Sequence, residues 1–195
     1  MNAIPPSLPR ATGPRPGGRS ARVQAAIHQA VRELLAEGPR ESLTVPAVAT
    51  RAGVTPSTIY RRWGDLSQLL ADVAVEQLRP EGEPADTGSY RGDLASWLEQ
   101  YRDEMSSGPG RTMLRDVLSA PRAENTGKCL LYCTTQIDLI RARALGRGET
   151  PLPTAVIIDG IVAPMMYHLL FAARTPTPDD VVGWLDELLA RHPRG

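Results

Sequence analysis

The stretch from Leu43 to Trp63 constrains the fold of this chain more than any other segment. Its apolar spacing predicts two short helices, from about Val45 to Arg51 and from Pro56 to Trp63, with a tight turn between them. Gly53 lies in that turn, where its lack of a Cβ allows a positive φ. Small or apolar residues suited to pack the two helices together are Val45, Val48, Ala49, Ala52, Val54 and Ile59. The pattern is that of a helix-turn-helix, whose second helix enters the major groove of DNA.

Helical periodicity also runs through the rest of the chain. A first helix is predicted to begin at Ser20 as N-cap and to end at Gly38, which we expect in the left-handed cap conformation. Asp65 is placed to cap a fourth helix and Thr177 to cap the last one. Further helices are predicted at about 89–105, 111–118, 126–145, 154–172 and 178–191, with a turn at 108–110. We find no alternating strand pattern and predict an all-α fold: an N-terminal three-helix helix-turn-helix domain plus a C-terminal helical bundle, about nine helices in total.

Composition divides the chain into three parts. Residues 1–19 hold five prolines, three glycines and three arginines with little to bury, and we predict a disordered basic arm. Residues 20–80 form the predicted DNA-binding domain, which includes the connecting fourth helix. Residues 81–195 form a helical body that begins with a stretch rich in Pro, Glu and Gly.

The net charge of zero hides an asymmetry along the chain. Through Asp65 there are nine arginines and four acidic residues, a balance of +5 that leaves −5 for the remainder. A basic N-terminal third indicates a polyanionic partner at that end, with a chance scatter of charges as the alternative. We expect Arg10, Arg15 and Arg19 to give weak, salt-sensitive support to DNA affinity without reading sequence.

The sequence disfavours several classes of protein. The N-terminus lacks the apolar core of a signal peptide, and the longest apolar run is interrupted by Asp159, Pro164 and His168. We therefore expect a cytoplasmic, nucleoid-associated protein without membrane contact. The two cysteines cannot form a disulfide framework and fit small buried positions. The three histidines are isolated, so no metal site, cofactor or enzymatic centre is predicted.

The geometry of a helix-turn-helix selects the candidate DNA contacts. Thr55 would cap the second helix of the motif and Pro56 would fix its first turn, where hydroxyls and amide groups suit phosphate oxygens. Arg61 has the fork of donors that can pair with guanine O6 and N7. The candidate DNA-binding residues are Thr44, Thr55, Pro56, Ser57, Thr58, Tyr60, Arg61 and Arg62.

From Ser20 to Leu70 the sequence resembles the DNA-binding domain of TetR/AcrR-type transcriptional regulators. The matching residues are Leu43, Thr44, Val48, Ala49, Ala52, Gly53, Val54, Thr58, Ile59, Tyr60, Arg61, Trp63, Leu69 and Leu70. The resemblance implies phosphate contacts for Thr44, Thr58 and Tyr60. It implies base contacts for Thr55, Ser57 and Arg61. It also implies a dimeric repressor that leaves a palindromic operator when a small hydrophobic ligand binds the C-terminal domain.

The predicted helix 154–172 is apolar on nearly all sides. Such a helix must be covered on both faces, and pairing with a second copy in a four-helix bundle does this for a chain of this length. A core helix within a monomer is the alternative. The predicted homodimer interface residues are Ile161, Met165, Leu169, Trp184, Leu185 and Leu188.

The sequence defines an effector pocket less well. Side chains that could line a cavity, and that could equally be ordinary core, are Trp97, Tyr101, Met113, Tyr132, Cys133 and Met165. Asp159 and His168 could pair across a dimer, face solvent or orient a ligand. Two other functions stay open at this point: a helical enzyme or ligand-binding protein that uses a C-terminal cavity, and a helical scaffold. The 21 arginines against one lysine point to a GC-rich bacterial genome.

Overall fold

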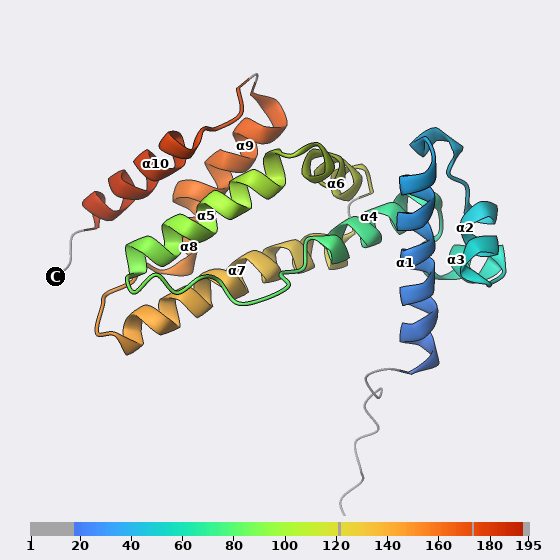
Figure 1. Cartoon of the computed structure of the whole chain (residues 1–195), viewed down its shortest axis with the longest axis horizontal. Coiled ribbons are helices and arrows are strands. Elements are labelled where there is room, and N and C mark those ends of the chain that lie inside the picture. Colours follow the sequence, from blue (N-terminus) through green and yellow to red (C-terminus); the bar gives the residue numbers. More distant parts are fainter. Residues whose placement is uncertain (1–17, 121, 173, 193–195) are drawn as a thin grey trace, which may run out of the picture. The chain divides into compact units, whose positions relative to one another are not determined.

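The computed structural model describes residues 18–120, 122–172 and 174–192, and these form helices and no strand. The all-α prediction is confirmed, and the described residues form nine helices when the continuous run from α8 to α9 is counted once. The chain divides into two compact units, residues 1–65 and 66–195 (Figure 1). The boundary precedes the fourth helix, whereas the predicted DNA-binding domain extended to residue 80. Most of the predicted basic arm, residues 1–17, lies outside the described residues.

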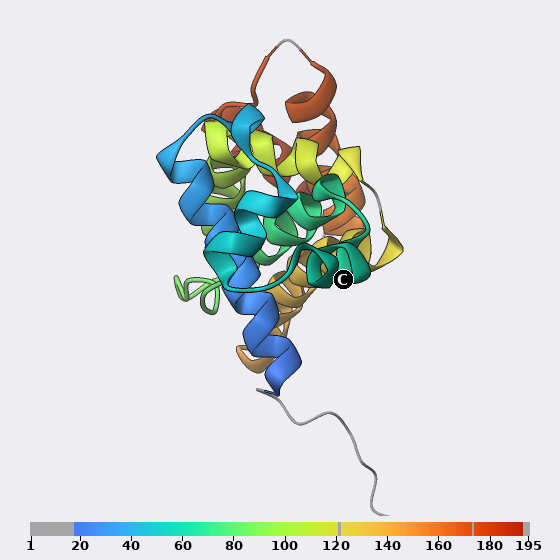
Figure 2. The same ribbon diagram turned by 90° about the vertical axis from the view of Figure 1, so that its right-hand side faces the viewer.

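The first unit is a three-helix domain. It consists of α1 (Arg19–Glu37), a 3₁₀ turn η1 (Arg40–Ser42), α2 (Val45–Ala52) and α3 (Pro56–Trp63). α1 packs on α2, and α2 packs on α3 (Figure 2). Fully buried side chains from all three helices are Ile27, Val31, Val48 and Ile59. At the surface, Arg51 of α2 donates to both carboxylate oxygens of Glu37 of α1, at 2.8 and 2.6 Å.

Two helix ends in this unit differ from prediction. α1 begins at Arg19 with Gly18 as N-cap, so Ser20 lies within its first turn. Gly38 has φ −159°, which is extended backbone and not the expected left-handed conformation. The reason is Pro39, because a proline favours extended backbone in the residue before it. Gly53 does adopt the predicted left-handed conformation, with φ 66° and ψ 34°.

The second unit is a helical bundle built around α5. Its elements are α4 (Leu66–Gln77), α5 (Tyr90–Ser106), α6 (Gly108–Ser119), α7 (Ala123–Gly146), α8 (Thr154–Ile157), the π-helical turn η2 (Ile158–Val162), α9 (Ala163–Phe171) and α10 (Pro178–Arg191). α5 contacts α6, α7, α9 and α10, while α4 packs on α6 and α7 (Figure 1). The predicted start of α10 is confirmed, since Thr177 and Asp180 form a reciprocal capping box.

α6 begins three residues before its predicted start. Gly108, Pro109 and Gly110 form its first turn, and the hydroxyl of the N-cap Ser107 accepts from the Gly110 N–H at 3.0 Å. Proline is tolerated here because the first amides of a helix have no partner within it. Gly110 is needed for packing, because a Cβ at this position would lie 1.9 Å from the carbonyl oxygen of Glu104.

The predicted helix 154–172 is interrupted by the π-helical turn η2. In a regular helix the ring of Pro164 would clash with the carbonyl of Gly160, and its nitrogen has no proton to donate. The turn directly before it accommodates the proline, with the Ala163 N–H bonded to the Ile158 carbonyl. The residues from Thr154 to Phe171 are apolar and long enough to cross a membrane by length and composition, and 28% of that stretch is buried in this structure.

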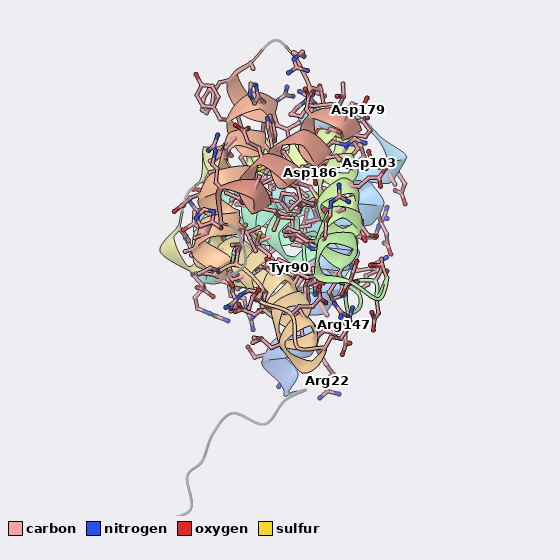
Figure 3. All side chains as sticks on the ribbon, turned by 90° about the vertical axis from the view of Figure 1, so that its left-hand side faces the viewer. Arg22, Tyr90, Asp103, Arg147, Asp179 and Asp186 are labelled. Carbon is pink, nitrogen blue, oxygen red and sulfur yellow. The ribbon has the colours of Figure 1, made fainter. Side chains whose placement is uncertain are left out.

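A buried charge network closes the end of the bundle where α5 begins and α7 ends (Figure 3). The fully buried Asp93 carboxylate accepts from the N–H and the hydroxyl of Thr87, at 2.6 and 2.8 Å, and from Arg147 at 3.0 Å. Burial alone would raise the pKa of Asp93, but these hydrogen bonds outweigh it and lower the pKa below its usual value. Arg143 donates to two carbonyl oxygens of the segment before α5. The linker-like segment is therefore tied to the bundle.

Candidate nucleic-acid interface

α3 has one face in the core of the first unit and another in solvent (Figure 2). Ile59 and Trp63, one turn apart, are 0% and 5% exposed, and they anchor the helix. The exposed side chains of this segment are Thr55, Pro56, Ser57, Tyr60 and Arg61. The candidate DNA contacts thus share the side from which a duplex can approach.

The N-terminal end of α3 carries a cluster of hydroxyls. Thr55 is the N-cap but makes no side-chain capping bond. Its Oγ1 instead lies 2.9 Å from the hydroxyl of Ser57 and 3.1 Å from that of Thr58. Pro56 has no N–H, so the first amide at this end belongs to Ser57. Amides and hydroxyls at a helix N-terminus bind anions, which makes this end suited to DNA phosphates and to polar base edges.

The two arginines of α3 differ in their surroundings. Arg61 is exposed and makes no ion pair within the described part of the chain. Arg62 is half-buried: its Nη2 donates to the Ser20 hydroxyl at 2.9 Å, and its guanidinium lies 6.0 Å from the centroid of the Trp63 ring. Arg62 therefore joins α3 to the first turn of α1. No sequence pattern indicates this contact, because Ser20 fits the pattern of an N-cap.

Thr44 is the N-cap of α2, with an exposed side chain. Its Oγ1 accepts from the N–H of Ala47 at 3.3 Å. Capping uses the hydroxyl only as an acceptor, so its proton remains available for a phosphate oxygen.

The predicted dimer-interface residues lie mainly in the interior of their own unit. Five of the six predicted residues are buried within their own unit: Ile161, Met165, Leu169, Leu185 and Leu188. They belong to the core that these helices share with α5 and α7, so most of their surface is covered within a single chain. Trp184, the sixth residue, is partly exposed.

Other apolar residues of α9 and α10 do reach the surface. Tyr167, Phe171 and Val182 are 63%, 74% and 40% exposed. The Tyr167 and Phe171 rings lie 5.6 Å apart, and the His168 ring stacks on Trp184 at 5.6 Å. We call Tyr167, His168, Phe171 and Trp184 the aromatic face. The helical period alone did not separate it from the core side, because both sides of the helix are apolar.

The candidate pocket residues pack in two hydrophobic clusters. Trp97, Tyr101, Cys133 and Met165 belong to the main core or pack against it. Met113 and Tyr132 pack instead on a small cluster of Ala74, Val75 and Val117. A surface groove of about 180 Å³ lies elsewhere, lined by Gly160, Pro164, Trp184, Glu187, Leu188 and Arg191. The sequence did not mark this groove, because two helices that are separate in sequence form its walls.

Two polar residues of the apolar helix, Asp159 and His168, and the two cysteines of α7 were further candidates for a functional role. Asp159 is exposed and His168 is partly exposed, so neither is a fully buried polar group in need of a partner. Burial raises the pKa of the Cys133 thiol to about 12, which keeps it protonated at neutral pH. The described residues contain no group of three or more side chains suited to hold a metal ion.

Comparison with known families assigns the chain to a class. A family model described as bacterial regulatory proteins of the tetR family matches residues 27–73. A second, described as the tetracyclin repressor-like C-terminal domain, matches residues 84–188, more than half of the chain. The chain belongs to the TetR family of bacterial transcriptional regulators. This confirms the resemblance drawn from the helix-turn-helix and excludes the helical enzyme, since the family consists of regulators.

Individual relatives agree with this assignment. An HTH-type transcriptional regulator of Mycobacterium tuberculosis is 29% identical over 174 residues, which cover 80% of each chain. The HTH-type regulator AqdR of Rhodococcus erythropolis is 26% identical, covering 89% of this chain and 88% of AqdR. The DNA-binding transcriptional repressor TetR of Mycobacteroides abscessus is also 26% identical, covering 86% and 92%.

Two solved structures share the fold. The TetR family regulator SCO0332 gives a TM-score of 0.63 at 24% identity and covers 86% of this chain and 96% of its own. A TetR regulator from Rhodococcus sp. RHA1 gives a TM-score of 0.58 at 19% identity, covering 88% and 98%.

Proposed function

We propose that this regulator is a repressor that binds a palindromic operator as a homodimer and is released by a small hydrophobic effector. In this proposal Thr55, Ser57 and Arg61 read base edges. The residues that hold phosphates are Thr44, Thr58 and Tyr60. The observation that carries the proposal is the solvent face of α3, where the hydroxyl cluster and Arg61 stand opposite the buried Ile59 and Trp63. The site of action is the cytoplasmic nucleoid.

A gel-shift experiment with DNA flanking the gene tests the operator. We expect a sequence-specific shift that weakens steeply as salt rises, because arginine–phosphate contacts release counterions. Tyr60→Phe should weaken the shift about fivefold, since it removes one exposed hydroxyl and leaves the ring. A shift equal to that of unrelated DNA would refute operator binding.

A second copy of the chain is the proposed occupant of the aromatic face. Tyr167 and Phe171 are large aromatic side chains that water contacts in a single chain, and a two-fold axis through this face would bury them in both copies. Two recognition helices would then meet successive major grooves, whose spacing is about one turn of DNA or a multiple of it. This arrangement matches a palindromic operator.

The proposed effector acts on the second unit. To release DNA, it must bind the conformation with low operator affinity more tightly than the conformation with high operator affinity. The coupling is reciprocal, so bound operator DNA weakens effector binding by the same factor. α4 connects directly to the DNA-binding unit in the chain and packs on α6 and α7. Between α4 and α7, Lys128 forms an ion pair with Asp72 at 3.3 Å. A ligand that separates these helices would displace α4.

A further inference from the structure

The Tyr101 hydroxyl has an unusually poor hydrogen-bond partner for its position. Tyr101 lies on α5, with its ring stacked on Trp97 at 5.3 Å. Its hydroxyl donates to the Met166 sulfur on α9 at 3.7 Å. Burial raises the pKa of this hydroxyl well above its usual value, so it is a proton donor at every physiological pH. A thioether is a weak hydrogen-bond acceptor. A buried hydroxyl that donates to one recovers only part of the hydrogen-bond free energy that it had in water.

The core that contains Tyr101 includes several flexible, sulfur-containing side chains. Met105, Met165 and Met166 all belong to the core around α5 or pack against it, as does Cys133 of α7. Methionine has three rotatable bonds and fills irregular gaps, so it can move aside at low cost. Tyr101, Cys133 and Met166 are also partly exposed. The hydroxyl therefore lies close beneath a surface that flexible side chains cover.

We propose that the space occupied by the Met166 side chain beside Tyr101 and Trp97 is a cryptic binding site for a small, neutral aromatic compound with one hydrogen-bond acceptor, such as an aryl ketone. Met166 moves aside, and the acceptor oxygen takes its place on the Tyr101 hydroxyl. The ligand ring packs on the Trp97–Tyr101 stack. This inference names the effector class for the proposed function and rests on it.

The chemistry of the site selects this class. Cys133, Cys129 and Glu104 all raise the pKa of the Tyr101 hydroxyl, so none of these three neighbours supplies a positive charge to it. An anionic ligand would therefore be buried without a counter-charge, which is costly, whereas a neutral carbonyl oxygen needs only the hydroxyl. The stacked rings of Trp97 and Tyr101 favour an aromatic partner over an aliphatic one.

Two compounds of similar shape test the proposal on the full-length protein without DNA. Acetophenone carries the acceptor oxygen, and ethylbenzene lacks it. Ligand-observed NMR titrations should show acetophenone binding about tenfold more tightly than ethylbenzene to the parent protein. Tyr101→Phe should abolish that preference. Tyr132→Phe, which removes a hydroxyl at the separate α4–α6–α7 cluster, should retain it.

A second variant keeps the test decisive if Tyr101→Phe folds poorly. Met166→Ala should bind acetophenone at least fivefold more tightly than the parent, since no side chain must be displaced. The proposal is overturned if neither compound binds at millimolar concentration, or if the preference for the ketone is the same in the parent and in Tyr101→Phe. A separate gel shift with acetophenone distinguishes this binding site from ligand-controlled release of the operator. If acetophenone binding depends on Tyr101 but leaves operator affinity unchanged, the result supports the binding site and counts against ligand-controlled release.

Discussion

Arg61 and Arg62 are adjacent arginines of equal charge, but they make different contacts in the structure. Arg61 extends into solvent from α3, whereas Arg62 is held by Ser20 and lies beside the Trp63 ring. Replacing each in turn with alanine removes the same charge from the same helix. The pair is therefore a matched test of which arginine contacts DNA and which one positions the helix.

The magnitudes follow from the contacts that each variant loses. Arg62→Ala loses one partly exposed hydrogen bond, worth about 1 kcal/mol, and one cation–π contact, worth about 0.5–1 kcal/mol. We expect the free energy of unfolding to fall by about 1–2 kcal/mol, and Ser20→Ala to reproduce about half of that. Arg61→Ala loses no such contact, so its stability should stay within about 0.5 kcal/mol of the parent. Its operator affinity should fall by about 1–3 kcal/mol if Arg61 reads a guanine.

Urea unfolding and operator titrations at several salt concentrations measure both effects. If Arg61 contacts a phosphate instead of a base, the slope of log affinity against log salt should fall by about one. Arg62→Ala should leave that slope unchanged under conditions where the variant is folded. The reasoning is refuted if Arg62→Ala unfolds like the parent, yet weakens operator binding and lowers the salt slope as much as Arg61→Ala does.

Three further changes test the second unit. Asp93→Asn should lower the free energy of unfolding by about 2 kcal/mol at pH 7, because it removes the charge of the buried carboxylate to which Thr87 and Arg147 donate, while Arg147 keeps its ion pairs with Asp86 and Glu149. The pKa of Asp93 is lower in the folded state than its unfolded value of about 3.9, so this stabilisation is complete above about pH 4. The difference between Asp93→Asn and the parent should therefore shrink in urea titrations below that pH, and a difference that does not depend on pH would contradict the charge argument. Gly110→Ala should lower the free energy of unfolding by about 2 kcal/mol or more. Gly108→Ala, in the same turn but with open space at its Cβ, should leave it nearly unchanged. Equal shifts in melting temperature for the two variants would show that the close contact at Gly110 is unimportant. If the proposed dimer forms through the aromatic face, Phe171→Glu should give a monomer in sedimentation experiments, and Leu145→Glu, at a 59% exposed site on α7, should not. A Phe171→Glu variant that remains a dimer would place the interface elsewhere.

The local sequence pattern predicted most of the secondary structure of the DNA-binding unit. The position of Gly53, the spacing of Val48 and Ile59, and the small Ala49 define two short helices and the turn between them. These are short-range effects, set by backbone sterics and by the helical period. They also place the candidate DNA contacts on the outer face of α3, because the inward positions are fixed by the apolar residues. The capping box of α10 was predictable for the same reason.

Tertiary packing determined which side of each helix is buried and which distant residues are in contact, and the local sequence pattern predicts neither. Helix 154–172 is apolar all round, so its periodicity did not tell core from surface, and only contacts with α5 and α7 placed Met165 inside and Phe171 outside. The link between Arg62 and Ser20 spans 42 positions of sequence, and no short-range rule relates two such residues. Gly108 and Gly110 indicated a turn by composition, yet in the structure they form the first turn of α6, which Ser107 caps and where Gly110 packs closely against the end of α5. Apolar periodicity thus determines where helices form, whereas the side on which each helix is covered depends on which neighbours the folded chain brings against it.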